Sequence, residues 1–267
     1  MFGVYKMELK EIQGSSTKWL GKTIAYYEEI DSTNTRLKEW AKEGAIEGSL
    51  VIAEKQNKGK GRLGKVWNSP EGEGIWMSVL VFPNIEMEKV PQLTLLAGLA
   101  TCEAVREVTG MEAMIKWPND LVLNGKKICG ILCELVKLEN GNGVIIGIGI
   151  NVNSKEFPSD LPYASSLYLE GGQVYKREMI IRSVLEHLEE YYILYKQTLS
   201  LTKMIEQYKL RCINLGKQVK VLSMQKEQIG TVKDIDLEGQ LIIETPQGEI
   251  ETIFAGEVSV RGLYGYI

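Results

Sequence analysis

The chain has 267 residues, a formal net charge of −4 and a single histidine. Its hydrophobic fraction of 44% and its charged fraction of 25% match those of globular proteins, so a substantial core is expected. The slight acidity argues against a protein that holds nucleic acid over a broad basic surface. The length exceeds that of a typical single domain, which favours one large domain with a smaller companion at one end.

Membrane insertion and permanent metal binding are not expected. No apolar run approaches the roughly 20 residues of a membrane-spanning helix, and the start of the chain lacks the apolar centre of a signal peptide, which predicts a cytoplasmic protein. The cysteines have no paired C-x-x-C spacing, and no nucleophile motif accompanies His187, which is expected to be a surface or packing residue. Apolar surroundings predict four buried thiols: Cys102, Cys129, Cys133 and Cys212.

The first half of the chain alternates between strand and helix patterns. Ser32 precedes a helical pattern that Gly44 stops, and Pro91 opens a long apolar helix that Gly110 ends. Runs rich in β-branched and aromatic residues predict strands between and after these helices. The predicted elements are helices over 32–44 and 91–110 and strands over 49–56, 74–82, 113–117, 127–136 and 144–152.

The pattern changes in the second half. A helix with one apolar face is expected over 177–197, followed by a second helical stretch that reaches about Cys212. After Gly216 come five short β segments, which predict a small barrel-like module. These segments are 218–223, 228–235, 240–245, 249–254 and 257–262.

The segment GKGRLGKV over 59–66 satisfies two nucleotide-binding patterns and fails both in detail. The dinucleotide fingerprint needs a helix that opens at its third glycine, and KVWNSPEGEG cannot begin one there. The phosphate loop of NTPases needs Ser or Thr after its lysine, where this chain has Val66. Two interpretations stay open: a solvated basic hairpin, or a loop that closes over an anionic ligand with Lys60, Arg62 and Lys65 as donors.

Three further segments accompany this loop in one order. They are EIDSTN over 29–34, KWPNDLVLNGKKICGIL over 116–132 and GIGINVN over 147–153. Together the four segments resemble the biotin protein ligase family. The loop follows that family's signature Gly-Arg-Gly-Arg-x-Gly-Arg, with Lys60 and Lys65 in place of its first and third arginines. This exchange predicts weaker adenylate retention or loop ordering, because lysine lacks arginine's bidentate geometry.

The resemblance covers the chain from about Ile24 to the C-terminus and implies an α+β fold. A class II aminoacyl-tRNA-synthetase-like catalytic domain, with a mixed β-sheet and packed helices, is expected over 24–214. A short extension over 1–23 precedes it, and an SH3-like β-barrel over 215–267 follows. Some family members carry an N-terminal DNA-binding domain, for which about twenty residues are too few, so DNA binding is not expected.

The resemblance also implies an enzyme with two successive reactions. Biotin and ATP, which brings Mg²⁺, form biotinyl-5'-AMP, and the biotin then passes to a lysine of a biotin carboxyl carrier protein or domain. The identity of the acceptor, the order of substrate binding and the formation of a homodimer stay open. Two other functions stay open as well: a lipoate-protein ligase with the same adenylation chemistry, and a non-catalytic nucleotide-binding module.

The resemblance assigns roles to individual residues. Those expected around biotin and its adenylate are Ser32, Thr33, Asn34, Gln56, Lys60, Gly61, Arg62 and Lys127. Those expected on the nucleotide side are Trp67, Asn119, Asp120 and Asn151. Short hydroxyl and amide side chains suit the two donors and one acceptor of a ureido ring. The apolar strand segments GILCEL and VIIGIGI suit a lipophilic tunnel for the biotin tail.

Three of these residues are the expected catalytic groups. Arg62 and Lys127 would offset the repulsion between the biotin carboxylate and the α-phosphate of ATP. Asp120 would orient the acceptor lysine and accept its proton. Ordinary structural roles also exist: Ser32 could serve only as a helix cap, and Asp120 could be a turn residue.

Overall fold

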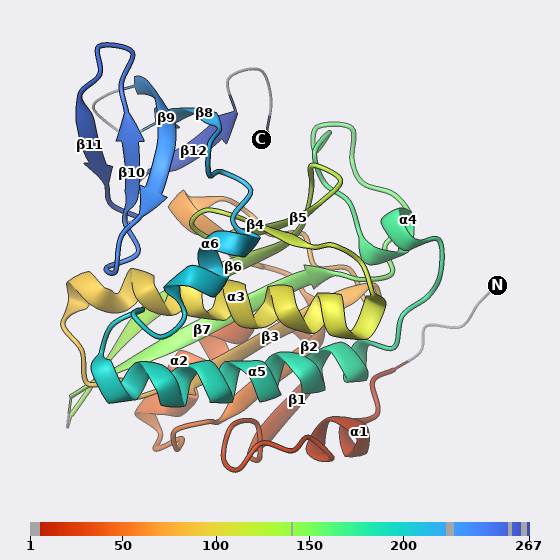
Figure 1. Cartoon of the computed structure of the whole chain (residues 1–267). Helices are drawn as coiled ribbons and strands as arrows, with labels where there is room; N and C mark the ends of the chain where they lie inside the picture. Colours follow the sequence, from red (N-terminus) through yellow and green to blue (C-terminus); the bar gives the residue numbers. More distant parts are fainter. Residues whose placement is uncertain (1–5, 140, 223–226, 256–257, 263–265) are drawn as a thin grey trace.

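The computed structural model describes residues 6–139, 141–222, 227–255, 258–262 and 266–267, and it contains two β-sheets (Figure 1). The larger sheet has seven strands in the order β1-β2-β3-β7-β6-β5-β4. Only β1 and β2 pair in parallel, so the sheet is mixed. Its strands are β1 (Ile24–Ile30), β2 (Leu50–Gln56), β3 (Gly74–Val81), β4 (Met114–Lys116), β5 (Asp120–Leu123), β6 (Lys126–Leu138) and β7 (Gly141–Asn151).

The two faces of the large sheet are covered unequally. Helices α3 (Val90–Thr109) and α5 (Arg177–Thr198) lie side by side across one face and bury most of the core (Figure 1). Helix α2 (Thr33–Lys42) packs on the other face through a small apolar cluster that includes Leu37 and Leu80. Because α2 is short, part of this second face is left for a binding site.

The long helices form where the sequence predicts them. Helix α3 has Pro91 in its first turn and ends at Gly110, whose φ of 71° lies in the left-handed region that glycine adopts without strain. Helix α5 buries a stripe of apolar residues at helical spacing. His187 on this helix contacts Glu107 and stacks on Tyr191, so the prediction of a surface or packing role is confirmed.

The smaller sheet is antiparallel and has the order β11-β10-β9-β8-β12. It packs on the large sheet next to the start of α3, where the indole N–H of Trp117 donates to the carbonyl of Gly239 at 3.0 Å. The amide of Gln92 donates to the carboxylate of Glu238 at 2.7 Å. Its strands are β8 (Gln218–Leu222), β9 (Glu227–Ile235), β10 (Leu241–Glu244), β11 (Ile250–Ile253) and β12 (Ser259–Gly262).

Several short elements had no prediction. Strand β1 (IAYYEEI) is a partly exposed edge strand, so its apolar and polar residues alternate only weakly and give no strand signal. Strand β5 has only four residues, too few for such a pattern. The other unpredicted elements are α1 (Leu9–Gln13), α4 (Leu167–Gly171) and the 3-10 turns η1 (Arg62–Gly64) and η2 (Met87–Lys89). The second helical stretch is α6 (Ile205–Arg211). Of the predicted β segments, Ser223 and Glu257 lie outside the described residues.

Two sequence expectations concern single segments or residues. The expected N-terminal extension contributes to the core, since Ile12 and Leu20 are fully buried in it.

Three cysteines are buried as predicted, but the prediction is wrong for Cys133, which is partly exposed. Cys133 lies on the wall of a cavity of about 250 Å³ together with Pro91 and Thr94 of α3, so the helix does not bury it completely. None of the helices in the described ranges is long and apolar enough to cross a membrane.

A buried ion pair ties α5 to the large sheet. Arg177 donates to Oε2 of Glu54 at 2.6 Å, and both side chains are almost fully buried. The other carboxylate oxygen accepts from the Tyr26 hydroxyl at 2.6 Å and from the backbone N–H of Met7 at 2.9 Å. Burial alone would raise the pKa of Glu54, but these hydrogen bonds outweigh it, and the pKa lies below its usual value. This network therefore stabilises the fold above the ordinary glutamate pKa and less as the pH falls.

Replacing Arg177 with methionine should lower the free energy of unfolding by about 3–5 kcal/mol, because it leaves the Glu54 carboxylate buried without its cation. The measurement is urea unfolding at pH 7. Arg182→Met is the matched control, since Arg182 makes only a partly exposed pair with Glu186 and should cost under about 1 kcal/mol. Equal losses for the two variants would contradict a special role for the buried pair.

Candidate active site

The floor of the site is a set of glycines on the face of the large sheet that α2 leaves uncovered. Side chains alternate between faces along a strand, so Gly147 and Gly149 of β7 point to the same side, and their neighbours Ile146 and Ile148 point to the core. Gly130 of β6 lies directly opposite Gly149. With no side chains on these glycines, other groups can lie close to the backbone of the two central strands.

Two adjoining cavities lie above this floor. The first is small, with about 50 Å³ of space, and the second holds about 520 Å³. They share a boundary wall that comes from the basic loop, from the start of β5 and from β6. The residues that line both cavities are Gly61, Arg62, Trp67, Asn119 and Lys127.

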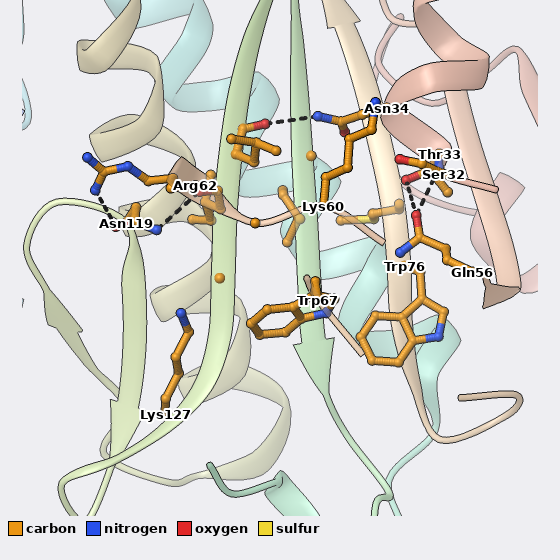
Figure 2. A pocket seen from close by; sticks show the side chains of 18 residues that line it. Ser32, Thr33, Asn34, Gln56, Lys60, Arg62, Trp67, Trp76, Asn119 and Lys127 are labelled. Carbon is orange, nitrogen blue, oxygen red and sulfur yellow. Dashed lines mark hydrogen bonds between the residues drawn. The ribbon is translucent and has the colours of Figure 1, made fainter. Parts of the chain in front are cut away.

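A chain of polar groups lines the first cavity (Figure 2). The side-chain oxygen Oε1 of Gln56 accepts from the backbone N–H of Thr33 at 2.8 Å and from the Thr33 hydroxyl at 3.1 Å. The Gln56 amide donates to Ser69 at 2.8 Å. Ser32 occupies the N-cap position of α2, but its side chain makes no capping hydrogen bond, so the capping role is not its function here.

Asn34 closes the far end of the first cavity and is held on three sides. Its amide nitrogen donates to Glu134 at 2.7 Å and to the carbonyl of Leu132 at 3.3 Å, while its oxygen lies 2.6 Å from the Ser78 hydroxyl. A Cβ at Gly147 would come within 2.2 Å of that oxygen. The position of Asn34 therefore depends on the missing side chain at Gly147.

Trp67 lies across the middle of the glycine floor, between Lys127 and Trp76 (Figure 2). The ammonium group of Lys127 is 5.2 Å from the centre of its ring, and a Cβ at Gly149 would come within 2.6 Å of its indole nitrogen. This indole N–H is buried and has no hydrogen-bond partner among the described residues. An acceptor atom on a ligand would satisfy it.

The basic loop forms a short hairpin. Gly61 and Lys65 pair through their backbones at 2.7 Å, and the N–H of Trp67 donates to the carbonyl of Gly59 at 2.9 Å. The backbone is extended at Lys65, so no helix opens after Gly64, as the sequence predicts. Part of the hairpin is exposed, but one face of it lines both cavities, which favours the ligand-closing interpretation over a purely solvated turn.

The guanidinium group of Arg62 contacts the C-terminal segment. It donates to Oδ1 of Asn119 at 2.7 Å, and to the carbonyls of Ala255 at 2.8 Å and Val258 at 3.1 Å. Lys60, by contrast, donates from an exposed position to the Thr35 hydroxyl at 2.8 Å. Arg62 thus connects the basic loop to both the large sheet and the segment before β12.

The second cavity contains a buried carboxylate surrounded by donors. Asp120 lies at the start of β5, and its Oδ1 is 2.5 Å from Nζ of Lys127. Its Oδ2 accepts from the Tyr266 hydroxyl at 2.5 Å. The wall on this side also includes Asn151, which donates to the carbonyl of Ser165 at 3.0 Å, and Lys116, which donates to the carbonyl of Val260 at 2.7 Å.

The charges of this cluster are coupled. Burial would raise the pKa of Asp120, but Lys127 and Lys116 outweigh it, so the pKa of this carboxyl lies below its ordinary value. Burial lowers the pKa of Lys116 to about 8. Burial and the neighbouring Asp120 carboxylate raise the pKa of Tyr266. At neutral pH the cluster therefore contains an ionised aspartate and a protonated phenol.

Every residue that the sequence predicted for the site lines one of the two cavities. Sequence reasoning missed four contributors. Ser78 and Trp76 could have been found from the alternation along β3, which puts both on the uncovered face. Lys116 belongs to a quoted segment without an assigned role, and Tyr266 has no local signal. The segments GILCEL and VIIGIGI, which were expected to line the tunnel for the biotin tail, contribute Gly130, Ile131, Leu132, Gly147, Ile148 and Gly149 to the first cavity.

Comparison with known proteins agrees with this arrangement. The family model described as "Biotin/lipoate A/B protein ligase family" matches residues 26–151, and the one described as "Biotin protein ligase C terminal domain" matches residues 215–261. The first match contains the basic loop, the glycine floor and Asp120. The second contains the small sheet.

Three similar proteins cover nearly the whole chain. The bifunctional ligase/repressor BirA of Bacillus subtilis is 37% identical over 260 residues, which is 96% of this chain and 79% of the relative. The biotin–[acetyl-CoA-carboxylase] ligase of Mycobacterium tuberculosis is 30% identical, over 93% of this chain and 92% of the relative. The structure of the biotin protein ligase of Aquifex aeolicus in complex with biotin and ATP is 35% identical, with a TM-score of 0.81, and the match covers 90% of this chain and 99% of that one. On these matches, which agree with two cavities that share Arg62 and Lys127 in one wall, the chain belongs to the biotin protein ligase family.

Proposed function

We propose that the two cavities carry out the two reactions of an ATP-dependent biotin protein ligase. The chain is an enzyme of this kind, with biotin and ATP as its substrates. The observation that carries the assignment of the cavities is their shared wall, where Arg62 and Lys127 border both. An acid in the first cavity and a nucleotide in the second would meet at these two cations.

The first cavity has the chemistry for biotin but lacks the room. Its space of about 50 Å³ lies far below the roughly 300–1,000 Å³ of ordinary ligand sites, so a bicyclic ring must displace side chains to enter. The hairpin over 59–67, which includes Trp67, lies on the solvent side of this cavity. We propose that this loop moves away to admit biotin and closes over the adenylate, where it would exclude water.

Activation joins the biotin carboxylate to the α-phosphorus of ATP. A carboxylate oxygen attacks phosphorus, the bond to pyrophosphate breaks, and a mixed anhydride forms. Lys127 and Arg62 would stabilise the negative charge that grows on the phosphoryl oxygens. Magnesium belongs to the ATP substrate and would neutralise the departing pyrophosphate.

Transfer forms the amide with the acceptor lysine. The neutral amine attacks the anhydride carbonyl, the C–N bond forms, the C–O bond to AMP breaks, and the amine loses a proton. Because the pKa of Asp120 is lowered, its carboxylate is a weak base. We therefore assign it the orientation of the amine through an accepted hydrogen bond, and the proton goes to solvent or to the leaving phosphate.

The test uses the purified protein with ATP, magnesium, radiolabelled biotin and a biotin carboxyl carrier domain. We expect label on the acceptor lysine only when ATP is present. Transfer of labelled lipoate in place of biotin would favour the lipoate ligase alternative, and the C-terminal match, which is described for biotin protein ligases, speaks against it. Nucleotide binding without any acyl transfer would identify a non-catalytic module.

Gly149→Ala should weaken binding of the adenylate about tenfold or more, because the added Cβ would displace Trp67 from the floor. Isothermal titration with a non-hydrolysable biotinyl-adenylate analogue measures this. Gly98→Ala is the matched control: it makes the same chemical change in α3 on the opposite face, where the nearest atom, of Ile131, is 3.8 Å from the new Cβ. Unchanged affinity in Gly149→Ala would reject Trp67 as part of the nucleotide site.

The domain bounds and the macromolecular partner belong to the same proposal. We infer a class II synthetase-like catalytic domain over 24–214, an SH3-like module over 215–267 and, before them, a short segment over 1–23, of which Ile12 and Leu20 pack in the core. The carrier protein is the proposed macromolecular partner. A cytoplasmic location and the absence of DNA binding stay predictions from the sequence, and dimer formation stays open.

A further inference from the structure

The last described residues of the chain reach into the second cavity. The Tyr266 hydroxyl donates to Oδ2 of Asp120 at 2.5 Å, while Lys127 lies 2.5 Å from Oδ1 of the same carboxylate. The two donors therefore contact different oxygens of one buried carboxylate. The match to the C-terminal family model ends at residue 261, so Tyr266 lies outside the segment that the model describes.

Several contacts hold Tyr266 in this position. Its ring stacks on Tyr163 with ring centres 5.5 Å apart and planes 18° apart, and the ammonium group of Lys116 is 4.2 Å from the ring centre. The final residue packs on β12, since a Cβ at Gly262 would come within 1.9 Å of the backbone oxygen of Ile267. The phenol is therefore fixed by contacts with the large sheet and with Tyr163, while its neighbour Ile267 packs on the small sheet.

We propose that Tyr266 is a positioning residue for the transfer step, in which its hydroxyl holds the Asp120 carboxylate in the orientation that receives the acceptor lysine. This inference rests on the proposed function. An ionised carboxylate has about four acceptor positions. Lys127, Tyr266 and the Asn119 amide, at 3.1 Å, occupy three of them. Among the donors in the described part of the chain, this leaves one position for the incoming amine, and its direction is set by the other three.

The size of the cavity argues that Tyr266 does not plug the site. About 520 Å³ of space remains with the ring in place, which lies within the range of ordinary ligand sites. The phenol is part of the wall, and a nucleotide and a lysine side chain can enter beside it. Its function is therefore to orient Asp120 and not to block access.

Adenylate formation and transfer depend on different groups of the site. Adenylate formation depends on the cations Arg62 and Lys127, whereas the Tyr266 hydroxyl donates its hydrogen bond to Asp120. Transfer depends on the direction of the amine, which Asp120 sets. Removing only the hydroxyl should therefore slow transfer and leave adenylate formation unchanged.

The experiment compares Tyr266→Phe with the natural protein in single-turnover assays. Biotinyl-adenylate is first formed on the enzyme, and a biotin carboxyl carrier domain is then added over a range of concentrations. We expect the transfer rate at saturating acceptor to fall about tenfold, with the half-saturating acceptor concentration unchanged and adenylate formation at the natural rate. The hydrogen bond from Tyr266 helps to lower the pKa of Asp120, so its loss raises that pKa. The decline of the transfer rate at acidic pH should therefore begin at a higher pH in the variant.

Tyr26→Phe is the matched control, because it removes a comparable bond, from a tyrosine hydroxyl to the Glu54 carboxylate at 2.6 Å, far from the site. It should lower stability and leave both reactions unchanged. Gly262→Ala is the second test variant: it displaces Ile267 and should reproduce the transfer defect of Tyr266→Phe.

Two results would overturn the positioning role: natural transfer by Tyr266→Phe, or an equal loss in both reactions. If the natural protein forms no biotinyl-adenylate, the proposed function itself fails. If it ligates biotin normally and Tyr266→Phe does as well, only the inference about Tyr266 fails.

Discussion

Replacing Lys127 with methionine should lower the rate of adenylate formation by roughly two to three orders of magnitude. Lys127 is one of the two cations that border both cavities, and an ammonium group has three donors, of which Asp120 takes one. The others can reach the acyl and phosphoryl oxygens that become negative during activation. Quenched-flow measurement of labelled biotinyl-adenylate, at saturating biotin and ATP, gives the rate.

Two further variants separate catalysis from folding. Lys126→Met removes the same charge one residue earlier, where the side chain points to Glu170 at 3.5 Å, and should form adenylate normally. The pair Lys127→Met with Asp120→Asn removes the carboxylate charge that the single variant leaves buried without its closest cation. It should regain stability in urea unfolding but not activity. Recovery of activity in the double variant, or normal activity in Lys127→Met, would exclude a direct catalytic role for Lys127.

The floor of the site was predictable because its signal is local. In VIIGIGINV the residues alternate, so isoleucines must occupy one face of a strand and glycines the other. One face of β7 is then apolar, as a face under helices should be, and the other is bare. The structure confirms this: Ile146 and Ile148 lie in the core, and Gly147 and Gly149 lie under Asn34 and Trp67.

The edges of the site were not predictable, because distant segments form them. Tyr266 and Asp120 are 146 positions apart in the chain. Their contact depends on how the small sheet packs on the large one, which no periodicity encodes. Ser78 is an intermediate case: the alternation assigns it to the uncovered face, but only the register with Gly147 shows that it meets Asn34.

The partners of Arg62 show the same limit. The sequence assigns this residue to a ligand-binding loop, and it does line both cavities. Its contacts with the carbonyls of Ala255 and Val258 span 193 and 196 positions, so they too follow from the packing of the two sheets. They give Arg62 a second function, in which it couples the loop to the C-terminal module.

Replacing Arg62 with alanine should let biotinyl-adenylate escape roughly a hundredfold faster than from the natural protein. The change removes the bonds that hold the hairpin to Asn119 and to the segment before β12, so the closed loop loses its anchor. Escaped adenylate reacts with any exposed amine. The measurements are the dissociation rate of preformed adenylate and the spread of label over bystander proteins in a mixture.

Arg62→Lys should retain only part of the effect, because a lysine ammonium cannot reach the three acceptors that the planar guanidinium group spans. Lys58→Ala is the control: it removes a positive charge from an exposed position just before the loop, outside both cavities, and should retain adenylate as the natural protein does. Fast release from Lys58→Ala as well would mean that loop charge alone retains the adenylate. Slow release and selective labelling by Arg62→Ala would show that the hairpin closes without its anchor, and the retention role would then have to move to Trp67 or Lys127.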